Sequence, residues 1–117
     1  MDVVLGLDAA APDDDAVERA IDRAQGDEVL VAAYGGDADI RESAAARARE
    51  RLAEAGLDPS TRLLGTDPGA RLVELAETGG YDCIVLGGSQ SPLGKVRLDA
   101  VTEFVVLNAR TSVTLVR

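Results

Sequence analysis

The sequence predicts an α/β domain in which helices cover both faces of a parallel sheet. Apolar runs of strand length alternate along the whole chain with segments of helical periodicity. One run, residues 83–86, has the length and unbroken apolar content of a strand buried on both faces. Gly, Pro and Asp residues separate the segments, as turns and helix ends require. Such alternation implies parallel strands joined by right-handed crossovers.

The first half of the chain is expected to form two strand–helix pairs. Residues 2–7 form the first strand. Three Asp residues, 13–15, then begin a helix, because acidic groups oppose the positive end of a helix dipole. Its apolar spacing continues to about residue 25 and stops at Gly26. Residues 28–34 form the second strand.

The next helix is predicted to start with a capping box, Asp39 and Glu42. Its inward face comprises Ile40, Ala44, Ala48 and Leu52. Gly56 ends it, and residues 60–64 form a weaker strand typical of a sheet edge.

The second half repeats the alternation. Asp67 and Pro68 start a helix, with Pro in its favoured first position. A strand at 83–86 follows. The helical spacing of Leu98, Val101 and Val105 predicts a last helix, with Asn108 as its C-terminal cap. Residues 112–116 form the last strand.

The length fits one domain, residues 1–117. The sequence contains no apolar run of about 18 residues, so a membrane span is not expected. The start of the chain carries an acid at Asp2 and no basic region, so a signal peptide is not expected. The single cysteine, Cys83, cannot form a disulfide within the chain, which suits the cytoplasm.

The charge balance is strongly acidic, with 21 acids, 12 bases and a net charge of −9. Lys95 is the only lysine. This argues against a nucleic-acid partner, which selects basic patches. Abundant Ala and Asp with few aromatics resemble proteins of salt-loving cells, where salt screens self-repulsion. A generic acidic mesophilic protein is the alternative.

Several catalytic and metal-binding classes lack their residues. The chain has no His, which removes Ser-His-Asp catalysis and imidazole metal ligands. The stretch around Gly94 and Lys95 resembles the tail of a P-loop. However, Ser89 stands where the first Gly belongs and Val96 follows the Lys, so it is not one. Residues 13–15 are interpreted as a solvated helix turn rather than a cation site.

The Gly-rich segment after residues 83–86 is the candidate ligand loop. Gly87 and Gly88 lie between a buried strand and a helix, where open α/β sheets bind phosphates. The alternative is that these glycines only make the turn.

Five stretches, VVLGLD, TDPGARLVELAE, YDCIVLGG, SPLGK and AVTEFVVLNARTSVTLVR, occur in an order and spacing that resemble the universal stress protein (UspA-like) family over nearly the whole chain. The resemblance implies a flavodoxin-like, Rossmann-like three-layer sandwich with a five-stranded sheet of order 3-2-1-4-5. It also implies a homodimer made through the last strand, residues 112–116, whose edge would otherwise lie open. In one branch it implies ATP at the ends of the first and fourth strands.

The resemblance also implies a set of candidate nucleotide-binding residues: Leu7, Asp8, Ala32, Gly87, Gly88, Ser89, Gly94, Lys95 and Val101. Leu7 and Ala32 would line the apolar side. Asp8 matches the family's acid that contacts the sugar or a metal, although a turn carboxylate is the alternative. Lys95 would meet phosphate, although a solvated lysine is the alternative.

The ATP-binding motif of that branch, G-x-x-G, nine residues and then G-S or G-T, is degenerate here. Gly87 matches, but Gln90 replaces the second glycine and Asp99 and Ala100 replace the last pair. Ala100 has no hydroxyl to donate. Asp99 puts a negative charge where an anion would bind, and it suits the N-cap of the last helix instead.

The sequence therefore predicts a non-catalytic stress-protein dimer with weak or absent ATP binding and a regulatory or protein-interaction role. It needs no cofactor, nucleic acid or membrane, and its protein partner is unknown. The alternative is a binder of an adenine nucleotide, such as a nucleoside, AMP or ATP, through the altered loop. A slow ATPase or autophosphorylating protein is a third hypothesis, against which the missing hydroxyl and base argue.

Overall fold

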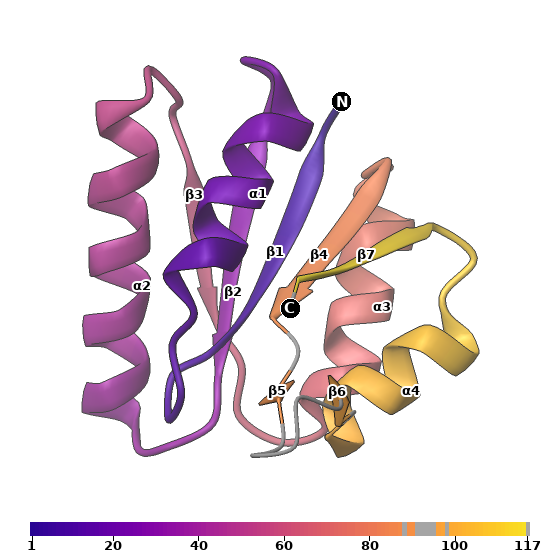
Figure 1. Ribbon diagram of the computed structural model, residues 1–117. Coiled ribbons are helices and arrows are strands. Elements are labelled where there is room, and N and C mark those ends of the chain that lie inside the picture. Colours follow the sequence, from indigo (N-terminus) through magenta and orange to yellow (C-terminus); the bar gives the residue numbers. More distant parts are fainter. Residues whose placement is uncertain (88, 91–95, 98, 117) are drawn as a thin grey trace.

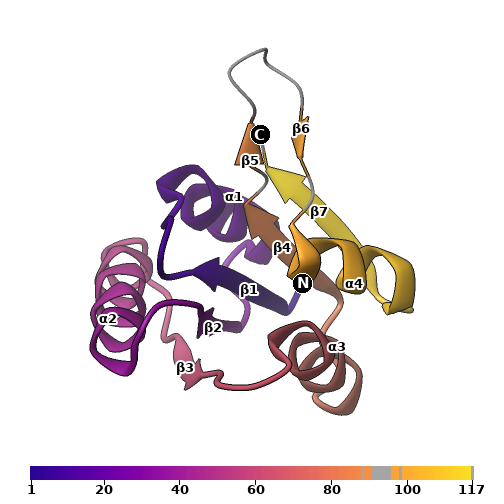
Figure 2. The same cartoon turned by 90° about the horizontal axis from the view of Figure 1, so that it is seen from below.

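The main sheet has five parallel strands in the order β3-β2-β1-β4-β7, which confirms the predicted fold and, to within a residue at each end, the predicted strands of this sheet (Figure 1). The computed structural model describes residues 1–87, 89–90, 96–97 and 99–116. Helices α1 and α2 cover one face of the sheet and α3 and α4 the other (Figure 2). The switch in strand order lies between β1 and β4, where crossovers leave in opposite directions.

The described elements follow the sequence in strict alternation, apart from one short hairpin. The strands of the main sheet are β1 Val3–Asp8, β2 Val29–Tyr34, β3 Ser60–Leu63, β4 Cys83–Gly87 and β7 Ser112–Val116. The helices are α1 Asp14–Ala24, α2 Ala38–Glu54, α3 Pro68–Thr78 and α4 Ala100–Asn108. Two-residue strands β5 Ser89–Gln90 and β6 Val96–Arg97 pair antiparallel after β4, where the sequence predicted only a loop.

The core forms two layers, one on each face of the sheet. Because side chains alternate along a strand, Leu7 and Ala33 enter the layer under α1 and α2. Ala32 and Tyr34 enter the layer under α3 and α4. Burial of both faces explains the unbroken apolar runs of β1, β2 and β4.

Helix α1 begins within the acidic run, as predicted, and Asp13 also caps it, which the sequence analysis did not predict. The backbone N–H of Asp15 donates to Asp13 Oδ1 at 2.9 Å, so the acidic run supplies the N-cap. Gln25 (φ 48°) and Gly26 (φ 88°) then leave the helix in the left-handed region.

The predicted start of α2 was wrong by two residues. Asp37, not Asp39, caps the helix, because the N–H of Ile40 donates to Asp37 Oδ1 at 2.9 Å. The glycines at 35 and 36 have positive φ and bring the chain to Asp37 in an extended conformation, so the helix begins early. Ile40 consequently sits in the first turn and is 44% exposed rather than buried.

The end of α4 also differs from the prediction. Asn108 is the last helical residue, and Ala109 is the extended cap. The Asn108 side chain donates to the Phe104 carbonyl at 2.8 Å. Leu98 lies outside the described residues.

Within the described part of the chain, none of the helices has the length and apolar character needed to cross a membrane.

Candidate functional site

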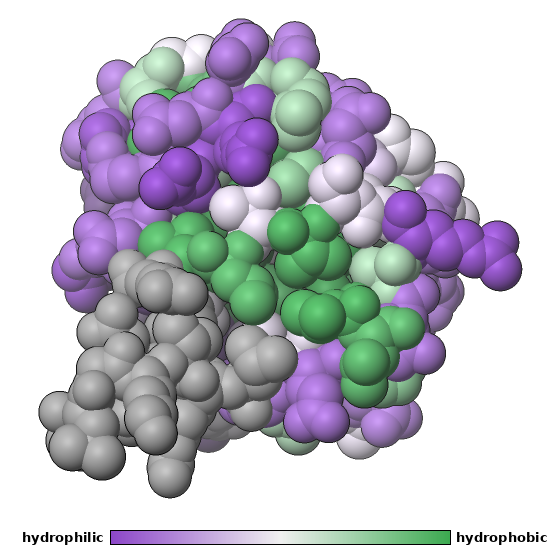
Figure 3. Space-filling view, turned by 45° about the vertical axis from the view of Figure 1, so that its right-hand side comes forward, coloured by the Kyte–Doolittle hydropathy of each residue, from purple (hydrophilic) through white to green (hydrophobic). Residues whose placement is uncertain are grey.

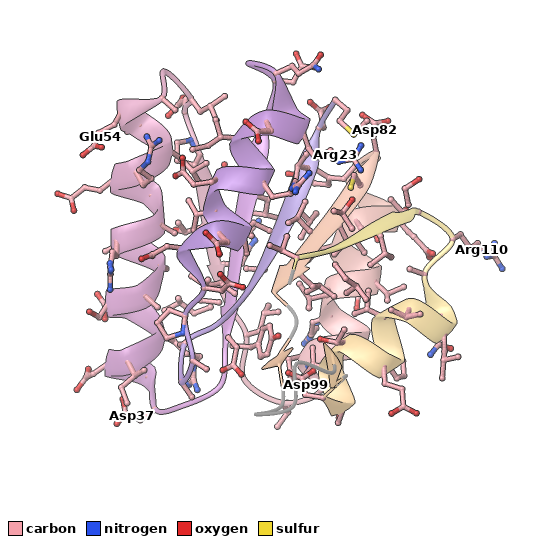
Figure 4. All side chains as sticks on the ribbon, viewed as in Figure 1. Arg23, Asp37, Glu54, Asp82, Asp99 and Arg110 are labelled. Atoms are coloured by element: carbon pink, nitrogen blue, oxygen red, sulfur yellow. The ribbon has the colours of Figure 1, made fainter. Side chains whose placement is uncertain are left out.

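A cavity of about 440 Å³ lies at the carboxyl ends of β1 and β4, at the switch point of the sheet. The starts of α1 and α4 close its sides (Figure 4). Its lining residues are Gly6, Leu7, Asp8, Ala11, Pro12, Asp13, Asp14, Asp15, Ala16, Gly87 and Asp99. This is where a ligand of an open α/β sheet is expected to bind.

The described lining carries five carboxylates and no basic side chain. Three of them already accept backbone hydrogen bonds. Asp8 Oδ1 accepts from the N–H of Ala10 at 3.0 Å. Asp99 Oδ1 accepts from the N–H of Thr102 at 2.8 Å, as the sequence predicted, and Asp13 caps α1 in the same way. The chain's own acids therefore occupy N–H groups that could otherwise hold a phosphate.

Gly87 has a structural reason to be glycine. A Cβ built on it would lie 2.8 Å from Asp13 Oδ2 and 3.0 Å from Asp13 Cβ. The end of β4 thus approaches the N-cap of α1 too closely for a side chain. The Asp13 carboxylate therefore lies between the end of β4 and the start of α1, on the wall of the cavity.

Gly35 likewise approaches a carboxylate, that of Asp8, too closely for a side chain. Its φ is +79°, and a Cβ built on it would lie 2.6 Å from Asp8 Oδ1. The Asp8 carboxylate is therefore held between the N–H of Ala10 and the backbone that follows β2.

We expect Gly35→Ala to destabilise the protein more than Gly56→Ala. Both positions have positive φ, which costs an alanine about 1–2 kcal/mol. Only at Gly35 does the added Cβ also displace a side chain, since nothing lies within 4 Å of the Cβ at Gly56. Chemical denaturation of the two variants measures the difference. Equal losses would show that the Asp8 carboxylate moves freely.

Tyr34 is a buried neighbour of the site that the sequence analysis did not single out; it packs in the core layer under α3 and α4 and does not line the cavity. It ends β2 in register with Asp8 and is only 4% exposed. Burial raises the pKa of its phenol far above the usual value, and the nearby Asp99 and Asp8 carboxylates raise it further. An aromatic residue at the end of an apolar strand, just before Gly35, was the signal available in the sequence.

The buried phenol predicts a loss of stability in alkali. The unfolded pKa of tyrosine is about 10, and the folded pKa of Tyr34 is higher. Its contribution is therefore complete below about pH 10 and is lost as the pH rises towards the folded value. We expect the unfolding free energy of the wild type to fall more steeply than that of Tyr34→Phe from about pH 9 to about pH 11. Parallel slopes in denaturation at each pH would contradict this.

The structure brings only some of the predicted site residues together. Leu7, Asp8 and Gly87 line the cavity. Ala32 is fully buried in the core layer on the opposite face of the sheet from Leu7 and does not line the cavity, so it does not join Leu7 in the predicted apolar wall. The reason is side-chain alternation, since Ala32 pairs with Gly6 in the parallel register.

Two other predicted positions, Val101 and Ser89, lie in α4 and β5. Val101 is half-buried in the first turn of α4 and does not line the cavity. Ser89 belongs to β5. Gly88, Gly94 and Lys95 lie outside the described residues.

Among the residues that are described, no three His, Cys, Asp or Glu side chains are placed to hold a metal ion.

A doubly wound sheet with a cavity at its switch point defines a flavodoxin-like α/β protein. The model of the universal stress protein family matches residues 29–117, and the chain belongs to that family. No curated protein matches the sequence significantly.

Solved structures agree with the family assignment. The chain is similar to a universal stress protein from Archaeoglobus fulgidus, with 23% identity, a TM-score of 0.83 and coverage of 100% of this chain and 98% of that one. A universal stress protein in complex with cAMP is 27% identical, with a TM-score of 0.78 and coverage of 99% and 95%. The A. fulgidus protein in complex with dAMP is 20% identical, with a TM-score of 0.79 and coverage of 100% and 98%.

Proposed function

We propose that this universal stress protein is a non-catalytic, cytoplasmic homodimer that binds ATP weakly or not at all and acts in the stress response through protein interaction or regulation. The carrying observation is the five-carboxylate lining of the cavity at the switch point. The proposal requires no cofactor, metal, nucleic acid or membrane. The acidic composition suits a cell with a salty cytoplasm.

Electrostatics oppose a triphosphate in this cavity. Two like charges about 4 Å apart repel by roughly 4 kcal/mol at an effective dielectric constant of about 20. Asp99 stands at the start of α4, where the dipole would otherwise attract an anion. Its carboxylate both cancels that attraction and occupies the N–H of Thr102.

Binding of an adenine nucleotide through an altered loop is the alternative. Similar structures contain cAMP, dAMP and AMP, ligands with a single phosphate. A ligand with fewer charges meets less repulsion from the carboxylates than ATP does. The slow ATPase is a weaker alternative, because the described cavity offers carboxylates but no hydroxyl at position 100.

Thermal unfolding with adenosine, AMP and ATP tests these alternatives, because a ligand that binds only the folded state raises the unfolding temperature. The proposal expects no shift with ATP. A shift with adenosine or AMP alone would favour the alternative, and a shift with ATP would contradict the proposal.

The proposed dimer interface is the open edge of β7. This strand pairs with β4 on one side, and its Leu115 is 36% exposed. Neighbouring α4 exposes Phe104, Val106 and Leu107. Figure 3 shows apolar surface gathered on this side of the molecule. Pairing with a second copy would cover both an unpaired strand edge and apolar surface.

We expect Leu115→Glu to make the protein monomeric. Pairing of two copies about a two-fold axis brings the new charges of both chains into one interface, where they repel. Leu63→Glu is the matched control, because Leu63 is an exposed leucine on β3, the opposite edge. Sedimentation velocity measures the assembly. The interface proposal fails if both variants behave alike.

A further inference from the structure

A second cavity, of about 620 Å³, lies between α1 and α2, and the proposed function does not use it. The two helices stand side by side on one face of the sheet (Figures 1 and 2). We call the space between them the α1–α2 groove. Its lining residues are Leu7, Ala9, Pro12, Asp14, Val17, Glu18, Asp37, Asp39, Ile40, Ser43, Ala44, Arg47, Ala48 and Arg51.

The floor of the groove is apolar and built largely from small side chains. Leu7, Ala9, Val17 and Ala48 are buried in its base. Alanines on the facing helix surface leave space that larger residues would fill. The volume lies within the range of small-molecule sites, which are mostly apolar with a few polar groups at the rim.

Two ion pairs cross the groove from α2 to α1. Arg47 Nη2 lies 3.3 Å from Asp14 Oδ2, and Arg51 Nη2 lies 2.7 Å from Glu18 Oε1. Each arginine in the lining is therefore balanced by an acid on the facing helix. Because these groups neutralise one another, neither arginine leaves a net positive charge to attract an anion.

The remaining charge of the groove is negative. Four carboxylates and two guanidinium groups line it, which leaves 2 − 4 = −2. The two further acids, Asp37 and Asp39, lie at the start of α2 beside the exposed side chain of Ile40, and the positive end of the helix dipole, equivalent to about half an elementary charge, offsets only part of their charge. Figure 4 places Asp37 at that end of the helix. An apolar floor thus ends in a negative rim.

We propose that the α1–α2 groove binds small molecules with an apolar body and a single positive charge. The apolar part packs on the floor, and the cation lies near Asp37 and Asp39. This site is separate in chemistry from a nucleotide site, although the two cavities share Leu7, Pro12 and Asp14. The proposal does not depend on whether ATP binds.

Three probes with one eight-carbon chain separate shape from charge: octylammonium, n-octanol and octanoate. Chemical shifts of the backbone amides report the location and affinity of each. We expect octylammonium to shift Val17, Ile40 and Ala44 and to bind about three- to tenfold more tightly than n-octanol at low salt. Octanoate should bind most weakly of the three. Added salt should reduce the differences in affinity between the probes, because it screens the charges.

Matched variants locate the site. Ala44→Trp should fill the groove and abolish binding, whereas Ala46→Trp, on the exposed outer surface of the same helix, should leave it unchanged. If Ala44→Trp unfolds, Ile40→Ala truncates an exposed wall residue and should weaken all three probes. Asp39→Asn should weaken octylammonium about threefold and leave n-octanol unaffected.

Three results would overturn the proposal. Tightest binding by octanoate would mean that the arginines recognise an anion. Equal affinity for the three probes would mean that charge plays no part. Absence of shifts in the groove at saturating probe would mean that the space is only a gap between packed helices.

Discussion

The double variant Asp99→Gly, Ala100→Ser should bind ATP at least about tenfold more tightly than the wild type. It removes the carboxylate that caps α4, frees the N–H of Thr102 and adds a hydroxyl at the first helical position. Gly is an acceptable N-cap and costs only a few tenths of a kcal/mol, so the helix is retained. Calorimetric titration of both proteins gives the ratio of affinities.

Two controls separate charge from capping. Asp99→Asn keeps a capping side chain but removes the charge, and it should recover part of the gain. Asp37→Gly removes the corresponding cap of α2, outside the lining of the cavity, and should leave ATP affinity unchanged. If the double variant gains nothing, Asp99 is not the group that excludes the phosphate.

Leu72→Ala should lower the free energy of unfolding by about 3 kcal/mol and the melting temperature by roughly 10 °C. Leu72 is fully buried between α3 and the sheet. A Cβ built on Gly6 would lie 3.3 Å from Leu72 Cδ1, so this leucine packs directly on the backbone of β1. The expected loss of stability has two parts: the hydrophobic free energy of the removed carbon atoms and the cost of the cavity that they leave in the core.

Leu75→Ala is the control on the same helix. Leu75 is half-buried at the margin of the same core layer, so its truncation should cost about 1 kcal/mol. Denaturant titrations of both variants measure the contrast. Similar losses would mean that α3 packs on the sheet through another surface than the one described.

The fold could be predicted because its signals are local and repeated. The apolar runs of β1, β2 and β4 reflect burial on both faces, and alternation with helices leaves few topologies. Asp99 was identified as an N-cap from its position alone, and the Thr102 hydrogen bond agrees. Asp37 was missed because two acids stand at that helix start, and left-handed glycines decide between them.

The site was less predictable because it depends on register and close approach. Leu7 and Ala32 both suit an apolar wall, but pairing of Ala32 with Gly6 puts them on opposite faces. The contact between Gly87 and Asp13 joins segments distant in sequence, which spacing cannot reveal. Tyr34 was overlooked because an aromatic in an apolar strand carries the same signal whether it lies in a core or at a site.

Calorimetric titration of the wild-type protein with ATP at high salt, with and without Mg²⁺, tests the central claim most directly. High salt screens the repulsion between ATP and distant acids of the chain, so any remaining exclusion of ATP comes from the cavity itself. We predict no measurable heat from ATP while the protein remains folded. Micromolar binding of ATP would contradict the account and make this protein an ATP-dependent switch.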